Sequence, residues 1–238
     1  MLEFEQAPTI NKVNNRIEKE KRFSNMNFND FKQITSKVQN MPLPGREAHN
    51  KMSSELRIKN ILQSNASFTE ARKAAVLACF YPDDTEKTYF LLTLRHTYKG
   101  VHSNQISLPG GKVEVTDADL TETALRETEE EIGIAQDNVV IVKTLSKVFI
   151  PPSNFLVQPY LGYVDDTPDF TIQEAEVATL VKVSFEDLLD DTLVEEVLMS
   201  TSYAKNIQVP AFNFNDYIVW GATGMILNEV KSLYKQVI

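Results

Sequence analysis

A glycine turn followed by an acidic helix is the sequence feature that most constrains how this chain can fold. The Leu-Pro-Gly-Gly stretch at 108–111 predicts a tight turn, because glycine adopts backbone angles that other residues avoid. Residues 120–132 then follow a helical pattern, which Gly133 ends. The helix carries three glutamates at spacings of three and four: Glu127, Glu130 and Glu131. With about 3.6 residues per turn, their carboxylates project from one edge of the helix.

The acidic edge has two interpretations. On a solvated helix, like charges at these spacings cost only about 0.2–0.5 kcal/mol per pair, so such a cluster can exist without a function. The helical wheel favours a cleft instead, because Leu120 and Ala124 share a line with Glu127 and Glu131. The outward face is left to Glu122, Arg126 and Glu129. Inside a cleft, two carboxylates about 5 Å apart repel by roughly 3 kcal/mol at an effective dielectric near 20, which favours a bound divalent cation.

The stretch from Gly111 to Ile134 resembles the Nudix box, the signature of a family that hydrolyses nucleoside diphosphates linked to another moiety. The matching positions are Gly111, Arg126, Glu127, Glu130, Glu131, Gly133 and Ile134. The interval between Gly111 and Arg126 is one residue longer than usual, and Thr128 stands where an aliphatic residue is common. One acid is expected in that interval, where this chain has three: Glu114, Asp117 and Asp119. The resemblance implies an α/β/α sandwich, in which a mixed β-sheet lies between helices, and a Mg²⁺ or Mn²⁺ cofactor.

The longer interval and the upstream residues resemble one branch of this family, the coenzyme A pyrophosphatases. That branch shows Leu-Leu-Thr-x-Arg, here at 91–95, a His-x-Gly-Gln turn before its Pro-Gly-Gly loop, here within 102–111, and Thr-Ala-Leu-Arg-Glu, here at 123–127. The chain departs from the branch at His96, Gly100, Asn104 and Leu108. The resemblance implies hydrolysis of coenzyme A or its thioesters to 3′,5′-ADP and a 4′-phosphopantetheine. The alternatives are another substrate, such as an ADP-sugar or a dinucleotide, and a non-catalytic nucleotide-binding regulator on the same fold.

The resemblance also implies roles for the acidic side chains. Metal ligands are expected at Glu127, Glu130 and Glu131, with the Gly111 carbonyl completing the metal shell. The general base is expected to be one of these glutamates or Glu176, which precedes a valine as an additional acid does in relatives. An exposed position at the start of a strand explains Glu176 equally well.

Three cations are candidates for holding the phosphates of the substrate: Arg95, Lys99 and Lys112. Lysines on loops are exposed by default, so solvent exposure is the alternative for each. Gly111 is counted with the substrate-binding residues because it is expected to let the backbone turn tightly there. Arg126 is expected to pair with a carboxylate and so to fix the acidic helix.

Composition limits the partners that the chain can bind. A net charge of −9 argues against general affinity for nucleic acid, so the expected partner is a small-molecule nucleotide diphosphate held by local cations and metal. No apolar run reaches the roughly 18–20 residues that span a bilayer, so we expect no membrane partner and a cytoplasmic location. Relatives often dimerise, which makes a homodimer an option. The single cysteine, Cys79, lies in an apolar stretch and is expected in the core.

The sequence pattern divides the chain into three parts. Residues 1–25 are polar and lack a periodic apolar stripe, which predicts a disordered or frayed extension. Residues 26–70 are expected to form a helical segment, with a helix at 28–38, and a linker, in which His49 is a surface or packing residue. Residues 71–238 are expected to form the Nudix domain. Its strands are expected at 73–80, 88–94, 101–107, 139–146, 147–150, 155–164 and 176–183, and its later helices at 184–189 and 220–236.

Overall fold

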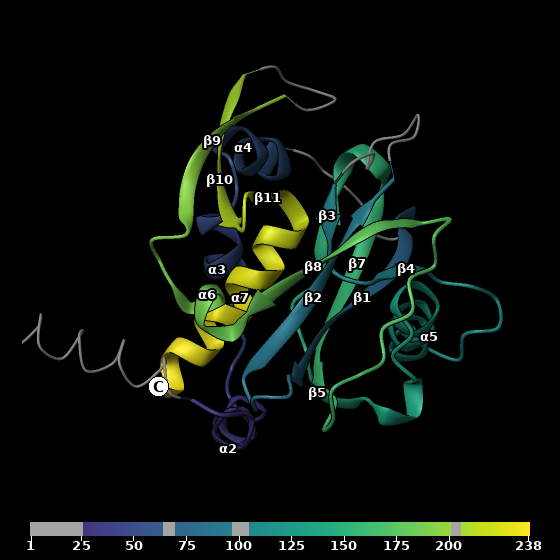
Figure 1. Ribbon diagram of the computed structural model, residues 1–238. Helices are drawn as coiled ribbons and strands as arrows, with labels where there is room; N and C mark the ends of the chain where they lie inside the picture. Colours follow the sequence, from purple (N-terminus) through teal and green to yellow (C-terminus); the bar gives the residue numbers. More distant parts are fainter. Residues whose placement is uncertain (1–25, 64–69, 97–104, 201–205) are drawn as a thin grey trace, which may run out of the picture.

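The computed structural model describes residues 26–63, 70–96, 105–200 and 206–238, and within them a mixed eight-stranded sheet lies between two layers of helices (Figure 1). The strands of this sheet are β1 (Arg72–Pro82), β2 (Thr88–Arg95), β3 (Ile106–Ser107), β4 (Gly110–Lys112), β5 (Val140–Thr144), β6 (Val148–Ile150), β7 (Phe155–Tyr163) and β8 (Val177–Ser184). The helices are α2 (Phe28–Val38), α3 (Arg46–Lys51), α4 (Glu55–Gln63), α5 (Leu120–Ile132), α6 (Phe185–Leu189) and α7 (Gly221–Val237). This arrangement confirms the predicted α/β/α sandwich.

The sheet opens at one end of its central strand, β1. Along one side, β1 runs parallel to β7, and β7 pairs antiparallel with β5 and β6. Along its other side, the second half of β1 pairs with β2, whereas its first half pairs with β4. β2 and β1 therefore separate, and the short strands β3 and β4 fill the space between them. The chain enters α5 from β4, so the acidic helix begins beside this opening.

Alternation along β1 decides which helices cover each face of the sheet. Ala75 and Cys79 belong to one buried cluster with Ala124 of α5, whereas Phe80 faces the cluster that α2, α6 and α7 share. Because both faces are covered, the strand is apolar almost without interruption. Burial raises the pKa of the Cys79 thiol to about 12, and the prediction of a core cysteine is confirmed.

Helix α2 is part of the core on the α7 side. Its first turn is closed by a capping box, in which Asn27 accepts from the Asp30 amide at 3.0 Å and Asp30 accepts from the Asn27 amide at 3.3 Å. The ring of Phe31 lies 5.1 Å from the ring of Phe80 and 5.5 Å from that of Tyr234 in α7. The helix predicted at 28–38 is confirmed, and it packs against the last helix of the chain.

Two parts of the fold differ from the sequence-based expectation. The glycines predicted to form a turn lie in strand β4, and a Cβ on Gly110 would overlap the Ala75 carbonyl oxygen of β1. A three-stranded sheet that the sequence pattern did not predict follows α6 and consists of β9 (Val194–Met199), β10 (Ile207–Phe214) and β11 (Tyr217–Val219). Of the strand predicted at 101–107, β3 is observed, and residues 101–104 lie outside the described part.

No helix in the described part is both long enough and apolar enough to cross a membrane.

Candidate active site

Helix α5 carries the predicted acidic site and is fixed at both ends. The Asp119 carboxylate caps it by accepting from the amides of Thr121 at 2.7 Å and Glu122 at 3.0 Å. At the other end, Gly133 adopts the left-handed conformation with a φ of 81°, and a Cβ there would contact the Thr171 amide at 2.8 Å. The caps fix where the helix begins and ends, and its packing against β1 and β4 turns its inner edge to the opening of the sheet.

Glu131 is the most buried of the three predicted glutamates. Only 2% of this residue is exposed, and its carboxylate accepts a hydrogen bond from the Gly110 amide of β4 at 3.2 Å. Burial raises the pKa of Glu131 to about 7, although Arg95 and the Gly110 amide oppose the shift. Unlike an acid on a solvated helix face, Glu131 therefore carries a charge that its surroundings only partly balance.

Glu127 lies one helical turn before Glu131, directly beneath Gly111 of β4. A Cβ on Gly111 would overlap the Glu127 carboxylate, so glycine at this position leaves room for the acid where it lies. Burial raises the pKa of Glu127, and the charges of Glu130 and Glu176 raise it further against the opposing effect of Arg126. Two partly compensated carboxylates thus lie at the opening between α5 and β4.

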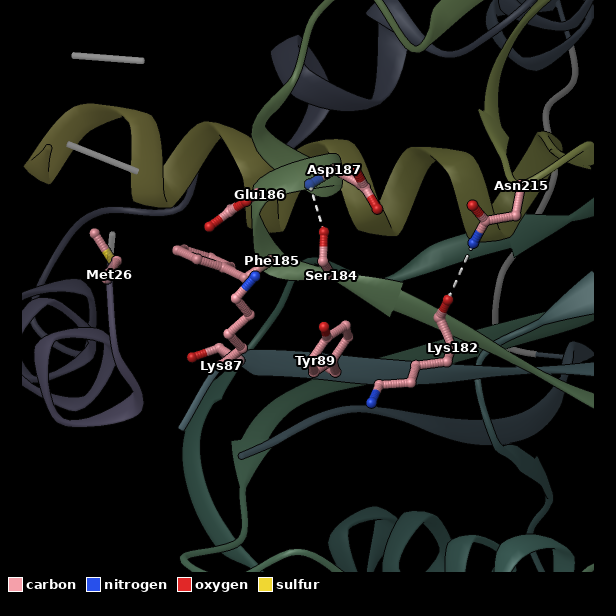
Figure 2. A pocket seen from close by; sticks show the side chains of 10 residues that line it. Met26, Lys87, Tyr89, Lys182, Ser184, Phe185, Glu186, Asp187 and Asn215 are labelled. Carbon is pink, nitrogen blue, oxygen red and sulfur yellow. Dashed lines mark hydrogen bonds between the residues drawn. The ribbon is translucent and has the colours of Figure 1, made fainter. Parts of the chain in front are cut away.

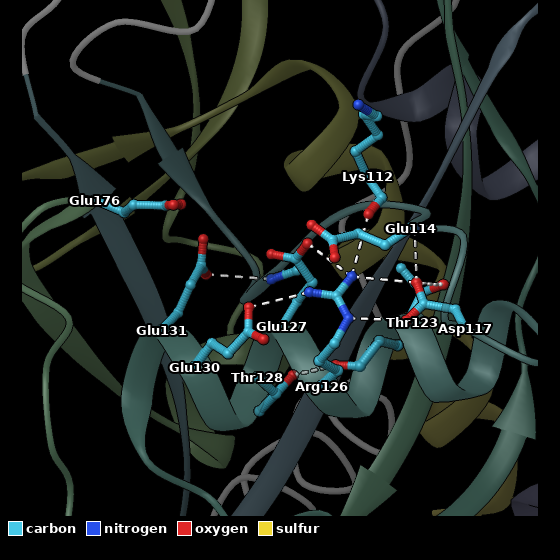
Figure 3. Close-up of polar contacts among 12 residues, drawn as sticks. Lys112, Glu114, Asp117, Thr123, Arg126, Glu127, Thr128, Glu130, Glu131 and Glu176 are labelled. Atoms are coloured by element: carbon cyan, nitrogen blue, oxygen red, sulfur yellow. Dashed lines mark hydrogen bonds and ion pairs between the residues drawn. The ribbon is translucent and has the colours of Figure 1, made fainter.

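Arg126 pairs with carboxylates, as predicted, and fixes the loop before α5 (Figure 3). Its guanidinium grips both oxygens of Asp117, with Nε 2.8 Å from Oδ1 and Nη2 3.1 Å from Oδ2, and it donates to the Lys112 carbonyl at 3.2 Å. Arg126 holds the pKa of Asp117 well below its usual range. The helical wheel placed Arg126 on the outward face, but only 15% of its side chain is exposed because it folds back over the loop.

Glu130 is placed differently from the other two glutamates. Half of its side chain is exposed, and its carboxylate accepts from Nη1 of Arg126 at 3.0 Å. The pairing follows from the spacing of four residues on one helix. The structure therefore brings Glu127 and Glu131 together beside β4 and leaves Glu130 at the rim.

Glu176 and Arg95 complete the acidic opening from the far side. Nη2 of Arg95, at the end of β2, lies 3.5 Å from Glu176 and 3.5 Å from Glu131. Glu176 stands just before β8, and its carboxylate points toward α5 (Figure 3). Glu176 was predicted as a candidate general base and Arg95 as a candidate phosphate-binding residue, from separate parts of the sequence. The structure places both beside Glu131.

The other predicted cations are less closely tied to the acids. The Lys112 amine points away from the glutamates in Figure 3, while its carbonyl accepts from Arg126. Lys99 lies outside the described residues. Asp117 was not singled out from the sequence as the partner of Arg126 among the acids before α5. Its position depends on the turn of this loop, in which Asp117 also accepts from the Glu114 amide at 2.8 Å.

The side chains at the acidic opening suit a divalent ion that takes some of its ligands from the protein and the others from water or a phosphate. No three His, Cys, Asp or Glu side chains in the described ranges lie close enough together to hold a metal by themselves, and Glu130 is paired with Arg126. Glu127 and Glu131 nevertheless supply hard oxygen donors, and the charge of Glu176 raises the pKa of both. Magnesium in proteins is commonly held by one or two carboxylates, with water and substrate phosphates filling the remaining positions.

A pocket lies at the opposite end of β2 (Figure 2). Its lining includes Lys87, which immediately precedes β2, Tyr89 of β2, and Lys182 and Ser184 of β8. The Lys182 amine lies 3.7 Å from the centre of the Tyr89 ring. At about 3.3 Å per strand residue, Tyr89 is about 20 Å from Arg95. None of the predicted site residues lines this pocket, so it is separate from the acidic opening.

Comparisons with known proteins agree with the motif that α5 carries. The NUDIX domain family model matches residues 71–199, which is more than half of the chain. The chain is 35% identical over 171 residues to "Nudix hydrolase 22, chloroplastic" of Arabidopsis thaliana, covering 69% of this chain but only 56% of the plant protein. It is 33% identical over 147 residues to "Uncharacterized Nudix hydrolase NudL" of Yersinia enterocolitica, covering 59% of this chain and 71% of that protein.

A solved structure of a C. elegans Ap4A hydrolase aligns with 69% of this chain and 98% of its own, at 20% identity and a TM-score of 0.46. The chain spans little more than half of the plant relative's length. The extent of the family match and the residues of α5 lead to one conclusion: this chain belongs to the Nudix family.

Proposed function

We propose that this chain is a metal-dependent hydrolase that cleaves a diphosphate linked to a nucleotide. The observation that carries the proposal is the placement of Glu127 and Glu131, which are largely buried beneath a strand whose glycine leaves room for a carboxylate. A solvated acidic face would not bury these groups, and a packed core would not leave their charges partly compensated. A binding module has no need of both glutamates, which argues against the regulator alternative.

The roles of the residues follow from the charge of the substrate. A diphosphate repels a water nucleophile, so the site must neutralise the nonbridging oxygens and position the water. A divalent ion, which Nudix hydrolases generally use, would supply this neutralisation and lower the pKa of water. We assign Glu127 and Glu131 as its principal ligands, with the Gly111 carbonyl beside them and Glu130 as a third donor once it leaves Arg126. Mg²⁺ and Mn²⁺ both suit these oxygen donors.

Arg126 acts through other groups and is a positioning residue. Its bonds to Asp117 and to the Lys112 carbonyl hold β4 above Glu127. Arg95, Lys99 and Lys112 are proposed to bind phosphates outside the metal site. Glu176 is proposed as the group that takes the proton from the attacking water, with one of the helix glutamates as the alternative base.

We propose coenzyme A or its thioesters as the preferred substrate. The support is the match of residues 91–95 and 123–127 to the coenzyme A branch and the longer interval before Arg126. An ADP-sugar or a dinucleotide is the second candidate, because the chain departs from that branch at positions 96, 100, 104 and 108. The catalytic unit is proposed to be residues 71–238, and the homodimer stays a prediction. The cytoplasmic location also stays a prediction, since the plant relative is named as chloroplastic.

A substrate panel tests the proposal. The protein is incubated with Mg²⁺ or Mn²⁺ and with coenzyme A, acetyl-coenzyme A, ADP-ribose or a dinucleoside polyphosphate, and the products are separated by chromatography. We expect 3′,5′-ADP from the coenzyme A substrates and a loss of at least about a hundredfold in rate for Glu127→Gln. Glu129→Gln, on the exposed side of the same helix, is the matched control and should keep its activity. Absence of turnover on every substrate would overturn the hydrolase proposal, and turnover of ADP-ribose alone would overturn the coenzyme A assignment.

A further inference from the structure

Arg95 ends β2 opposite an irregularity in the neighbouring strand β8. Leu94 of β2 pairs with Thr179 of β8, but Arg95 pairs with Val177, so Ala178 has no partner of its own in this ladder. Bulges of this kind re-aim a side chain and are common beside active sites. The extra residue belongs to β8, so the start of β8, next to Glu176, is the part that bends, and the Arg95 guanidinium at the end of β2 lies beside the acids of α5.

Arg95 contacts two carboxylates from different elements. Its Nη2 lies 3.5 Å from Oε1 of Glu131, whose side chain is 2% exposed, and 3.5 Å from Oε2 of Glu176, whose side chain is 46% exposed. The loop that carries Glu176 is itself fixed to the end of α5, because the Gln173 amide donates to the Glu131 carbonyl and the Thr171 amide donates to the Ile132 carbonyl, both at 3.1 Å. Arg95 therefore bridges two acids that the backbone holds near each other.

A divalent ion bound by Glu131 would share this carboxylate with Arg95. Two cations within a few ångströms of one acid repel each other, and the low exposure of Glu131 weakens the screening of that repulsion. A substrate phosphate offers Arg95 a different partner, since guanidinium binds phosphate oxygens with two parallel hydrogen bonds. The guanidinium can therefore lose its place beside Glu131 and still remain paired when a nucleotide is present.

We propose that Arg95 is a resident counter-ion of the acidic opening: it neutralises Glu131 and Glu176 in the metal-free protein and weakens metal binding until a phosphate ligand draws it away. The inference rests on the proposed function, because it takes Glu131 as a metal ligand. It makes metal and nucleotide bind cooperatively, and by linkage each raises the affinity for the other. The metal would then bind firmly when a substrate is present and weakly when the site is empty.

The test is the affinity of the full-length protein for Mn²⁺ without nucleotide, with free Mn²⁺ measured by electron paramagnetic resonance. We expect Arg95→Gln and Arg95→Met to bind Mn²⁺ about tenfold more tightly than the wild type, because a competing charge is gone. Arg95→Lys keeps the charge and should stay near the wild type. Arg72→Gln is the control for net charge, since the exposed Arg72 guanidinium lies 4.1 Å from the centre of the Phe155 ring and donates to the Ser153 carbonyl instead of to the acids of α5.

The outcomes separate this inference from the proposed function. The inference is overturned if both neutral variants are folded by thermal unfolding and yet bind Mn²⁺ no more tightly than the wild type. Arg95 would then have only a structural role. An equal gain in Arg72→Gln would overturn it as well, because the effect would then be one of net charge. If the wild type hydrolyses nucleotides but Arg95→Gln binds Mn²⁺ no better, the inference alone fails. If the wild type neither hydrolyses the panel nor binds Mn²⁺, both fail.

Discussion

At the scale of single residues, Glu131 shows a conflict between stability and the proposed activity. A carboxyl group whose pKa rises on folding from 4.5 to about 7 binds more protons in the native state than in the unfolded state between these values. Stability is then lost as pH rises through this range. The cost belongs to the metal-free protein, and it is the charge that a bound cation would neutralise.

Glu131→Gln is therefore expected to stabilise the metal-free protein. In EDTA at pH 8, the free energy of unfolding should rise by as much as about 3 kcal/mol, and the gain should shrink toward pH 5, where Glu131 is protonated in the wild type. Urea unfolding at both pH values measures the difference, with the exposed Glu129→Gln as the control. A variant that is less stable than the wild type at pH 8 would show that the Glu131 charge is well compensated, contrary to the burial described above.

The positions of the candidate site residues were predictable where they depended on local spacing. Glu127 and Glu131 are separated by one helical turn, so their shared edge follows from the sequence alone. The choice of Asp117 as the partner of Arg126 could not be predicted, because it depends on how the loop before α5 turns. Glu130 follows Arg126 by four residues and Glu127 by three, so it can lie beside either of them on the helix. The helical wheel does not show that Glu130 pairs with Arg126.

At the scale of elements, the two adjacent glycines of β4 have different tasks. A Cβ on Gly110, whose φ is 145°, would overlap the backbone of Ala75, whereas the atoms nearest to a Cβ on Gly111 are those at the end of the Glu127 side chain. A backbone neighbour cannot move without disrupting the β1–β4 ladder, but a side chain can rotate. The first glycine thus maintains the sheet, and the second maintains the position of the acid.

Alanine substitutions should separate these tasks. Gly110→Ala is expected to lower the free energy of unfolding by about 3 kcal/mol or more, because of overlap and backbone strain. Gly111→Ala should cost about 1 kcal/mol or less in EDTA and yet weaken Mn²⁺ binding at least about tenfold, since it displaces Glu127. Thermal unfolding and Mn²⁺ titration measure the two effects. Equal losses of stability in both variants would contradict this division.

Elements with strong end signals were predictable, and elements made by distant pairing were not. The sequence pattern predicts α5 and its end at Gly133, because a glycine cap acts within one turn, whereas the Asp119 cap at its start was not predicted. The pairing of β4 with β1 joins residues more than thirty positions apart and leaves no local signal. The sheet of β9, β10 and β11 was missed because its strands alternate only weakly between buried and exposed residues.

At the scale of the whole molecule, the N-terminal helices and the domain share one core. Glu229 of α7 is fully buried and accepts from the amides of Gly45 and Ser146, each at 3.0 Å, while Nε2 of His49 lies 3.3 Å from it. Although burial opposes the shift, hydrogen bonds from His49 and Ser146 hold the pKa of Glu229 below its usual range. His49 is thus a packing residue, as predicted. The sequence treats 26–70 as a separate segment because these contacts span about 180 positions.

This shared core supports the acidic opening from behind. The aromatic rings of α2 and α7 pack against the face of β1 that lies opposite α5, so both helices brace the strand on which β4 and Gly111 are placed. If the helices on either face were lost, β1 would lose the packing that holds it in place. The position of Gly111 over Glu127 depends on β1, because β4 pairs with it. The packing of the core therefore helps to set the geometry of the site.

The most direct test of the central claim is the metal dependence of diphosphate cleavage. Hydrolysis of coenzyme A is followed by ³¹P NMR in EDTA, and then after Mg²⁺ is added in excess. For the wild type, we predict no cleavage in EDTA and restored release of 3′,5′-ADP with Mg²⁺; for the double variant Glu127→Gln, Glu131→Gln, we predict no restoration. Cleavage that continues in EDTA, or that Mg²⁺ restores equally in the double variant, would contradict the account.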